Sequence, residues 1–289
     1  MCTGQSYSVY CTSTIGYNNQ LFLDVTGRND WNGVLAVEKI NYFYPSASLS
    51  WVASETFKLP ESVNLLKFRI AKANVGNGLL RRRSIDTYSF DASDWGAAKT
   101  VSINASLVDK DIKPQHSITT EGGFDLGMFN DRVRLGFTYF VKLQKDQIDN
   151  IPTVQGTGYS GLLTNIGDVR NKGFEIELGL TPIKTKAFNW DIAASFTKYK
   201  AVITRLSDKF APNGYVFADY GRNEKVRIAV GEEIGNMNKA NPVLRVKSGK
   251  YAGQPLLDGS GGEFQNSGAE RDRASLGNFN PDFIHCVHP

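Results

Sequence analysis

The feature that most constrains this chain is a regular alternation of apolar and other side chains that begins at Val133. Every second residue from there is apolar: Val133, Leu135, Phe137, Tyr139 and Val141. Successive side chains of a strand point to opposite sides, so this pattern predicts a strand with one apolar face. Asn130 and Asp131 precede it, and both tolerate the positive φ of a tight antiparallel turn. The sequence therefore predicts a hairpin with one apolar face.

The same alternation returns in residues 173–180 and 189–197. In the first of these stretches, Glu175 and Glu177 lie opposite the apolar positions, and two carboxylates cannot face a packed core cheaply. A soluble β-sandwich would turn such a polar face to bulk water. A transmembrane barrel would instead turn the apolar face to lipid and the polar face to a lumen. Periodicity alone fits both architectures.

Further strands are predicted at residues 7–17, 21–28, 43–51 and 67–73. The apolar face of residues 7–17 has Tyr7 at one end and Tyr17 at the other. Tyrosine is enriched at the two interfaces between a membrane and water, so these positions are typical of a strand that spans a membrane. Lys72 falls on an apolar face, which is acceptable where a lysine can extend to the interface. Residues 76–114 are predicted to form a long loop with one strand at 100–108, and the chain is predicted to be loop-like from Val226 onward.

Composition narrows the choice of fold and partner. Among 289 residues there are 28 Gly, 12 Tyr and 17 Phe, which favours an all-β protein. No apolar run reaches the roughly 18 residues of a transmembrane helix, but a transmembrane barrel needs no such run. The net charge of +4 and the single run Arg81–Arg83 give no nucleic-acid footprint. The first residues lack the apolar segment of an export signal.

The sequence contains no catalytic or cofactor-binding motif with the flanking structure that such a motif needs. Residues 156–161 match a dinucleotide fingerprint in letters, but no strand precedes them and no helix pattern follows. Glu175 and Glu177 project side by side from one strand. Glycoside cleavage instead requires two carboxylates that face each other across a cleft. Three scattered cysteines and the tail 285–288 make neither a disulfide framework nor a convincing metal site. We therefore expect no enzyme, no cofactor and no metal.

Four segments in order along the chain resemble the SusC/RagA family of TonB-linked outer-membrane transporters. They are Asp24–Trp31, Tyr42–Ser46, Asn165–Glu175 and Leu276–Phe283. The resemblance implies a barrel of about 22 strands with a plugged lumen in the outer membrane. It further implies import of oligosaccharides or peptides, with TonB and a SusD-like surface lipoprotein as partners and outer-membrane lipid around the barrel. Lys72 stands where the family usually has an aromatic residue, and Phe279 where it usually has a proline.

From these observations we expect residues 1–289 to form an all-β, antiparallel transmembrane β-barrel segment, an open and curved sheet that is a partial barrel. No plug domain is recognised, residues 284–289 look atypical, and we expect the isolated chain to be a fragment that does not transport. The alternative is a soluble β-sandwich that binds carbohydrate. Under the barrel interpretation, the candidates for lumen-facing side chains are Asp24, Arg28, Tyr44, Arg134, Glu175, Glu177 and Asp191.

Overall fold

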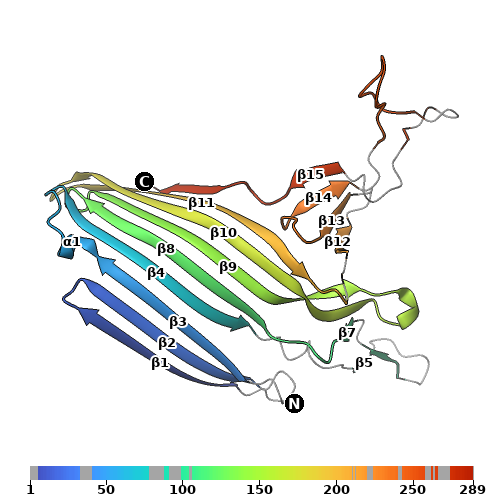
Figure 1. Cartoon of the computed structure of the whole chain (residues 1–289), viewed down its shortest axis with the longest axis horizontal. Helices are drawn as coiled ribbons and strands as arrows, with labels where there is room; N and C mark the ends of the chain where they lie inside the picture. The colour runs from blue at the N-terminus through green and yellow to red at the C-terminus, as the bar shows by residue number, and fades with distance from the viewer. Residues whose placement is uncertain are drawn as a thin grey trace.

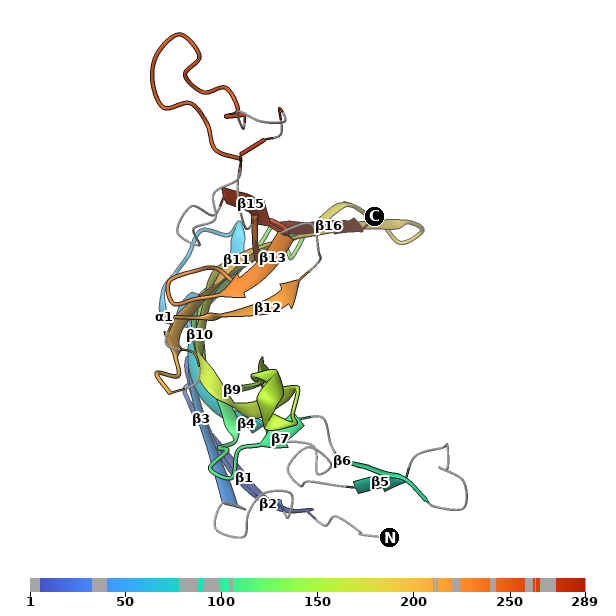
Figure 2. The same ribbon diagram turned by 90° about the vertical axis from the view of Figure 1, so that its right-hand side faces the viewer.

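The structure is a computed structural model that describes residues 6–32, 41–77, 88–90, 99–103, 106–209, 211, 213–219, 224–239, 243–257, 262, 264–265 and 274–288. Its main element is a ten-stranded sheet in the order β1-β2-β3-β4-β8-β9-β10-β11-β16, with β7 paired to β10 beside this path (Figure 1). Seen from the side, the sheet is an open arc (Figure 2). The predicted all-β, open and curved sheet is confirmed.

Eight long strands form most of this sheet. Their bounds are β1 Ser6–Tyr17, β2 Leu21–Asn32, β3 Asn41–Val52, β4 Val63–Asn77, β8 Gln115–Met128, β9 Val133–Pro152, β10 Gly161–Lys184 and β11 Asn189–Leu206. Each pairs antiparallel with the next along the sheet. Three of the four connections at the end on the left of Figure 1 are turns of three or four residues, whereas every connection between neighbouring long strands at the other end has eight residues or more. We call these the short-turn end and the long-loop end.

Two turns at the short-turn end contain residues with positive φ. Asn18 and Asn19 adopt φ of 49° and 56° between β1 and β2. Between β8 and β9 the turn is wider than predicted, because Phe129 has φ of 54° in addition to 56° at Asn130 and 61° at Asp131. A positive φ is uncommon for an aromatic residue, so the neighbouring structure must hold it. The amide of Phe129 donates to the carbonyl of Ser62, at 2.8 Å.

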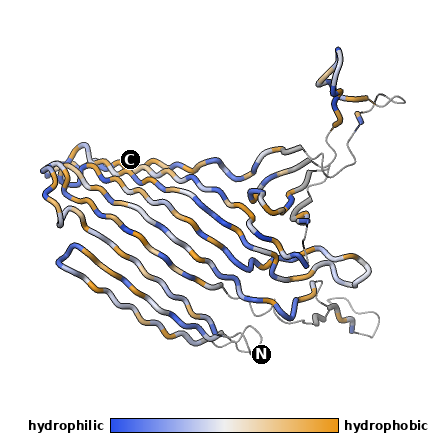
Figure 3. The backbone as a smooth tube through the Cα atoms, in the orientation of Figure 1, coloured by the Kyte–Doolittle hydropathy of each residue, from blue (hydrophilic) through white to orange (hydrophobic). Residues whose placement is uncertain are grey.

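Hydrophilic and hydrophobic residues alternate along the long strands (Figure 3), and this alternation gives the sheet two different faces. The convex face carries apolar side chains, including Phe137, Tyr139, Ile176, Leu178, Ile192 and Phe196. Many side chains of this face are exposed, among them Ile70, with 56% of its surface accessible, and Ile15, with 61%. In water such an extended apolar face would be costly, so its natural surroundings are apolar.

A row of aromatic rings crosses the convex face from strand to strand. It consists of Trp51, Phe68, Phe124, Phe137, Phe174, Phe196 and Phe283. Centroids of consecutive rings lie between 5.5 Å and 6.4 Å apart, the range in which aromatic pairs attract. The row joins the six neighbouring long strands β3, β4, β8, β9, β10 and β11. We call it the aromatic row.

A second sheet lies on the concave side at the long-loop end (Figure 2). Its strands are β12 Tyr215–Asp219, β13 Glu224–Ile228, β14 Asn236–Lys239 and β15 Ala274–Asn278. Ile203 and Leu206 of β11 pack there against Ile228, and Ile203 is only 2% exposed. The phenol of Tyr215 donates to Asp149 Oδ2, at 2.8 Å. Burial, reinforced by this bond, raises the pKa of Tyr215 above its ordinary value of 10.0.

Several sequence predictions about the long connections are wrong. The predicted strand at 100–108 is divided into β6 (Val101–Ile103), which pairs with β5 (Tyr88–Phe90), and β7 (Ser106–Val108). β7 pairs with β10 in parallel, so the main sheet is not antiparallel throughout. The region after Val226 is not simply a loop, because it contains β14, β15 and β16 (Ile284–His288). The run Arg81–Arg83 lies outside the described residues.

The end of the chain also differs from expectation. The edge of β11 near Phe196 is covered because β16 pairs antiparallel with residues 193–197. The segment that looked atypical is thus a regular strand in its described part. Helical structure is slight, with α1 spanning Ala53–Thr56. Among the described residues, no helix has the length and apolar character needed to cross a membrane.

Candidate functional site on the concave face

Polar side chains and glycines on the concave face line up in rows that cross the strands near the short-turn end. The first row contains Lys67, Asp125, Gly136, Glu177, Ser195 and Cys286 at paired positions of β4, β8, β9, β10, β11 and β16. The second, two residues further toward the long loops, contains Arg69, Gly123, Thr138, Glu175 and Thr197. Ser195 and Ile203 are an even number of residues apart on β11, so they point to the same face. Ile203 packs against the second sheet, which lies on the concave side, so the rows are on the concave face.

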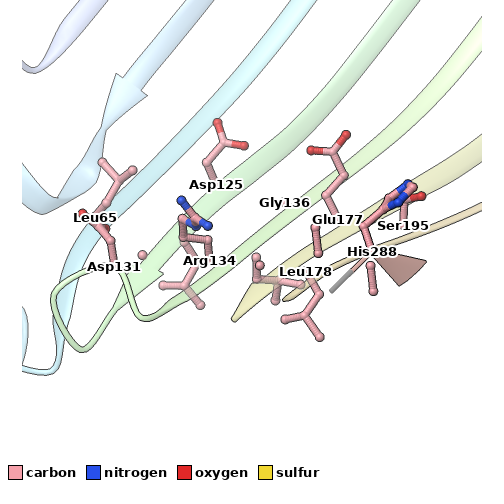
Figure 4. A pocket seen from close by; sticks show the side chains of 15 residues that line it. Leu65, Asp125, Asp131, Arg134, Gly136, Glu177, Leu178, Ser195 and His288 are labelled. Carbon is pink, nitrogen blue, oxygen red and sulfur yellow. The ribbon is translucent and has the colours of Figure 1, made fainter. Parts of the chain in front are cut away.

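The first row borders a shallow hollow of about 450 Å³. Its lining includes Asp125, Arg134, Glu177, Ser195 and His288. Figure 4 shows the carboxylates of Asp125 and Glu177 pointing to one side of the sheet, while Leu178 points to the other. The two faces therefore differ in chemistry at adjacent residues of one strand.

Some of these charges are paired and others are not. Arg69 Nη2 lies 3.6 Å from Asp125 Oδ1 and donates to Thr138 Oγ1, at 2.6 Å. Arg134 Nη2 lies 4.0 Å from Asp191 Oδ1, which also accepts a bond of 2.5 Å from Thr181. Within the part of the chain that the structure describes, neither Glu175 nor Glu177 has an ion-pair partner. Two carboxylates are thus available to a ligand or to another polypeptide segment.

A glycine in the neighbouring strand allows Arg134 to lie across the sheet. A Cβ added at Gly179 would lie 3.0 Å from Arg134 Nε and 3.2 Å from Nη2, closer than side chains normally approach. Because glycine leaves that space free, the guanidinium can extend over β10 toward Asp191. The small residues of this face therefore make room for long charged side chains.

A second polar group lies on β2 and β3. Asp24 accepts hydrogen bonds from Thr14, at 2.7 Å, and from Ser48, at 3.1 Å. Arg28 pairs with Asp30 at 2.7 Å and lies opposite Tyr44, whose ring stacks on Tyr42 with centroids 6.2 Å apart. All seven candidates share the concave face, but the structure divides them into this group and a group on β9–β11.

Between the two groups lie residues that sequence reasoning did not select. They are Lys67 and Arg69 of β4, and Glu121 and Asp125 of β8. Lys67, Arg69 and Asp125 alternate with apolar neighbours, so the period-two signal could have identified them. Glu121 lies between Thr120 and Gly122, where this signal is absent. They connect the two groups into one polar surface across the arc.

The groups on this concave surface are ones that form hydrogen bonds, ion pairs and ring contacts. The described residues contain no group of three or more His, Cys, Asp and Glu side chains placed to hold a metal ion. The glycine-rich stretch 156–161 forms only the 3₁₀ turn Gln155–Thr157 and a strand start, so it has no helix to bind a phosphate. Charges of both signs, hydroxyl groups and tyrosine rings remain, which suit a polar ligand in passage.

Comparison with known proteins places this arrangement among membrane receptors. Residues 3–280 match the family described as TonB dependent receptor-like, beta-barrel. The chain is similar to TonB-dependent receptor P39 of Formosa agariphila, with 28% identity over 80% of this chain and 21% of the relative. It is also similar to TonB-dependent receptor SusC of Bacteroides thetaiotaomicron, with 25% identity over 84% of this chain and 24% of SusC.

Among solved structures, the RagAB peptide transporter superposes with a TM-score of 0.77 at 16% identity. The match covers 98% of this chain and 31% of the transporter chain, and it shows the fold alone. This chain therefore spans about a fifth to a quarter of the length of the curated receptors it matches.

Proposed function

Because the chain belongs to the TonB-dependent receptor-like β-barrel family, whose members reside in the outer membrane and act as receptors and transporters, we propose that its sheet is part of the wall of an importer. In this proposal the convex face meets lipid and the concave rows line the lumen. A barrel with a plugged lumen takes about 22 strands, so the ten-stranded sheet supplies somewhat less than half of such a wall.

The observation that carries the proposal is the exposed apolar convex face opposite a polar, glycine-containing concave face. A lipid-facing wall requires this arrangement, since water lies only on its inner side. A soluble β-sandwich would need a second sheet over the apolar face at a distance of about 10 Å. The second sheet lies instead against the concave side, and no described element covers the aromatic row. The sandwich is therefore the weaker explanation.

We further propose that the substrate is an oligosaccharide or a peptide. Both are polar chains, and the concave face offers carboxylates, guanidinium groups, hydroxyl groups and the stacked Tyr42–Tyr44 pair. One solved structure of the same fold is a peptide transporter. The resemblance to SusC and RagA adds two proposed partners, TonB as the energy source and a SusD-like lipoprotein as the lid at the long-loop end.

Adjacent cysteines can test which face meets water. In a chain with Cys2, Cys11 and Cys286 changed to Ser, we expect Glu177→Cys to react with a membrane-impermeant maleimide in intact outer membranes. Leu178→Cys, one residue along β10, should react only after detergent is added, because lipid shields it. Equal reactivity of the two cysteines before detergent would contradict the assignment of faces.

The substrate class needs a transport measurement. Uptake of labelled peptides and of labelled oligosaccharides should be compared in cells that depend on the receptor containing this segment. We expect Asp125→Asn combined with Glu177→Gln to change the uptake of one class, while Lys186→Gln in the exposed β10–β11 turn leaves both unchanged. If neither class enters cells with the unaltered receptor, the proposed substrates are wrong.

A further inference from the structure

Four basic side chains gather on the convex face of β10 and β11, where the apolar pattern stops. They are Arg170, Lys172, Lys198 and Lys200, and all four are exposed. In the register, Lys172 lies opposite Lys200, and Lys198 lies opposite Phe174 of the aromatic row. The alternation places them on the same face as Leu178 and Phe196. We call these four residues the basic cluster.

The distance of the basic cluster from the short-turn end corresponds to the thickness of a membrane. On β11 the convex face begins with Trp190 and continues through Ile192, Ala194 and Phe196 to Lys198 and Lys200. Trp190 and Lys200 are separated by about ten residues, the length with which a tilted strand crosses the hydrocarbon core. Tryptophan is typical of one interface, and lysines that follow an apolar stretch are typical of the other.

The charge of the basic cluster is largely uncompensated. Its neighbours on β9, namely Tyr139, Val141 and Leu143, carry no charge in their ordinary states. Glu233 approaches Lys200, with 3.6 Å between Oε2 and Nζ. Asp168 is the next carboxylate along β10, and Arg205 already binds it at 2.8 Å. Four cations and the one carboxylate of Glu233 leave a formal charge of +3.

This isolation contrasts with the concave face, where Arg69 and Arg134 each have a carboxylate within 4.0 Å. Among the residues that the structure describes, Arg170, Lys172 and Lys198 have no ion-pair partner. Cations beside an apolar face in lipid lose part of their hydration, which is costly. An anion from the surrounding membrane would offset this cost by pairing with them. The anions that a membrane interface supplies are the phosphates of lipid headgroups.

We propose that the basic cluster binds the phosphate groups of an anionic lipid in the outer leaflet, the leaflet at the long-loop end. Arg170 can hold a phosphate with two parallel hydrogen bonds, and the three lysines act as point charges around it. Tyr139 and Phe174 lie directly below, where the acyl chains begin. The inference rests on the proposed function in one respect, because it requires the convex face to be in lipid.

The test uses the receptor that contains this segment, extracted from its own outer membrane in mild detergent. After washing, lipid phosphate that remains bound is measured by native mass spectrometry and phosphorus analysis. Lipid is then added back to delipidated protein in three arms: phosphorylated lipid from that membrane, the same lipid after phosphatase treatment, and inorganic phosphate. The variants are Lys172→Gln/Lys198→Gln, its charge-preserving partner Lys172→Arg/Lys198→Arg, and the concave-face control Lys67→Gln/Lys142→Gln.

We expect the glutamine variant to lose about thirtyfold in affinity for phosphorylated lipid, because two basic residues at the interface are removed. The arginine variant and the concave control should bind as the unaltered protein does. Equal binding by the glutamine variant, or equal binding of phosphatase-treated lipid, would overturn the inference, and so would binding of inorganic phosphate as tight as that of lipid. Failure of the proposed function would be recognised separately, because the unaltered protein would then be absent from the outer-membrane fraction.

Discussion

The two halves of β10 differ in how far their side chains are buried. In residues 161–167, near the long loops, most side chains are buried or partly buried on both faces, and Leu163 and Ile166 belong to packed cores. In residues 171–180 exposure alternates, and the exposed positions on the concave side include Glu175 and Glu177. The first half resembles a strand of a soluble protein, and the second half has no protein core. One strand thus passes from a packed core to a two-sided wall, which in the proposed function separates lipid from a lumen.

The largest expected effect concerns the packed half. Ile203→Ala should cost about 2–5 kcal/mol in the local stability of the second sheet, because it leaves a cavity beside Leu206 and Ile228. Hydrogen exchange of β12 and β13 should accelerate by the same amount in lipid and in detergent. Val202→Ala, on the opposite face, is the control and should leave this exchange nearly unchanged.

A slightly smaller effect is expected in the membrane half. Leu178→Arg should cost about 2–4 kcal/mol of folding stability in lipid vesicles, since it places a charge against hydrocarbon. Glu177→Arg, one residue away on the concave face, should cost much less. Reversible unfolding by urea in vesicles measures both. Equal costs would mean that the two faces of this half meet the same solvent.

The aromatic row gives a third comparison within the membrane half. Phe137 stacks on Phe124 at 5.7 Å and on Phe174 at 6.3 Å. Phe137→Ala should therefore cost about 1–3 kcal/mol, from two ring contacts of about 0.5–1.5 kcal/mol each. Val141→Ala on the same face of β9 removes no ring contact and should cost less in the same vesicle assay. A larger loss at Val141 would show that the rings do not connect the strands.

The smallest effect, about 1 kcal/mol, is expected at Tyr215, which joins the second sheet to β9 through Asp149. The pKa of Tyr215 is raised in the folded state, so its contribution is complete below pH 10 and is lost as pH rises above 10. Tyr215→Phe should lower the stability of the second sheet at neutral pH and remove this alkaline loss. Proteolysis of the second sheet across pH would detect both, and an unchanged pH profile in the variant would contradict the role of the phenol.

The sequence predicted strands and their faces correctly where the two faces of a strand have different surroundings. The alternation from Val133 to Val141 and from Phe174 to Leu180 exists because adjacent residues meet different surroundings, and both strands and their faces follow from it. The seven candidates reach the concave face for the same reason. Their lining of a lumen remains a proposal.

The same signal is absent where the prediction was wrong. β12 to β15 are four or five residues long, and register shifts interrupt two of their three ladders. Val226 and Ile228 are buried, and Ile228 packs against Ile203 and Leu206 of β11, a contact that no local sequence pattern predicts. β16 has the sequence Ile-His-Cys-Val-His, which shows no regular alternation, and its partner strand lies far away in the chain. Sequence periodicity reports the surroundings of a strand and not the identity of its neighbour.

The pairing of β16 with β11 has a consequence for the order of folding. Neighbours such as β8 and β9 or β10 and β11 are joined by turns of a few residues, so their ladders can form rapidly from local contacts. Thr197 and Ile284 must instead meet across about 90 residues, and loop-closure entropy opposes that encounter. Prior assembly of the second sheet shortens the effective loop, because it draws residues 215 and 278 together. We therefore expect β16 to be the last strand of the sheet to dock, after both the hairpins and the second sheet have formed.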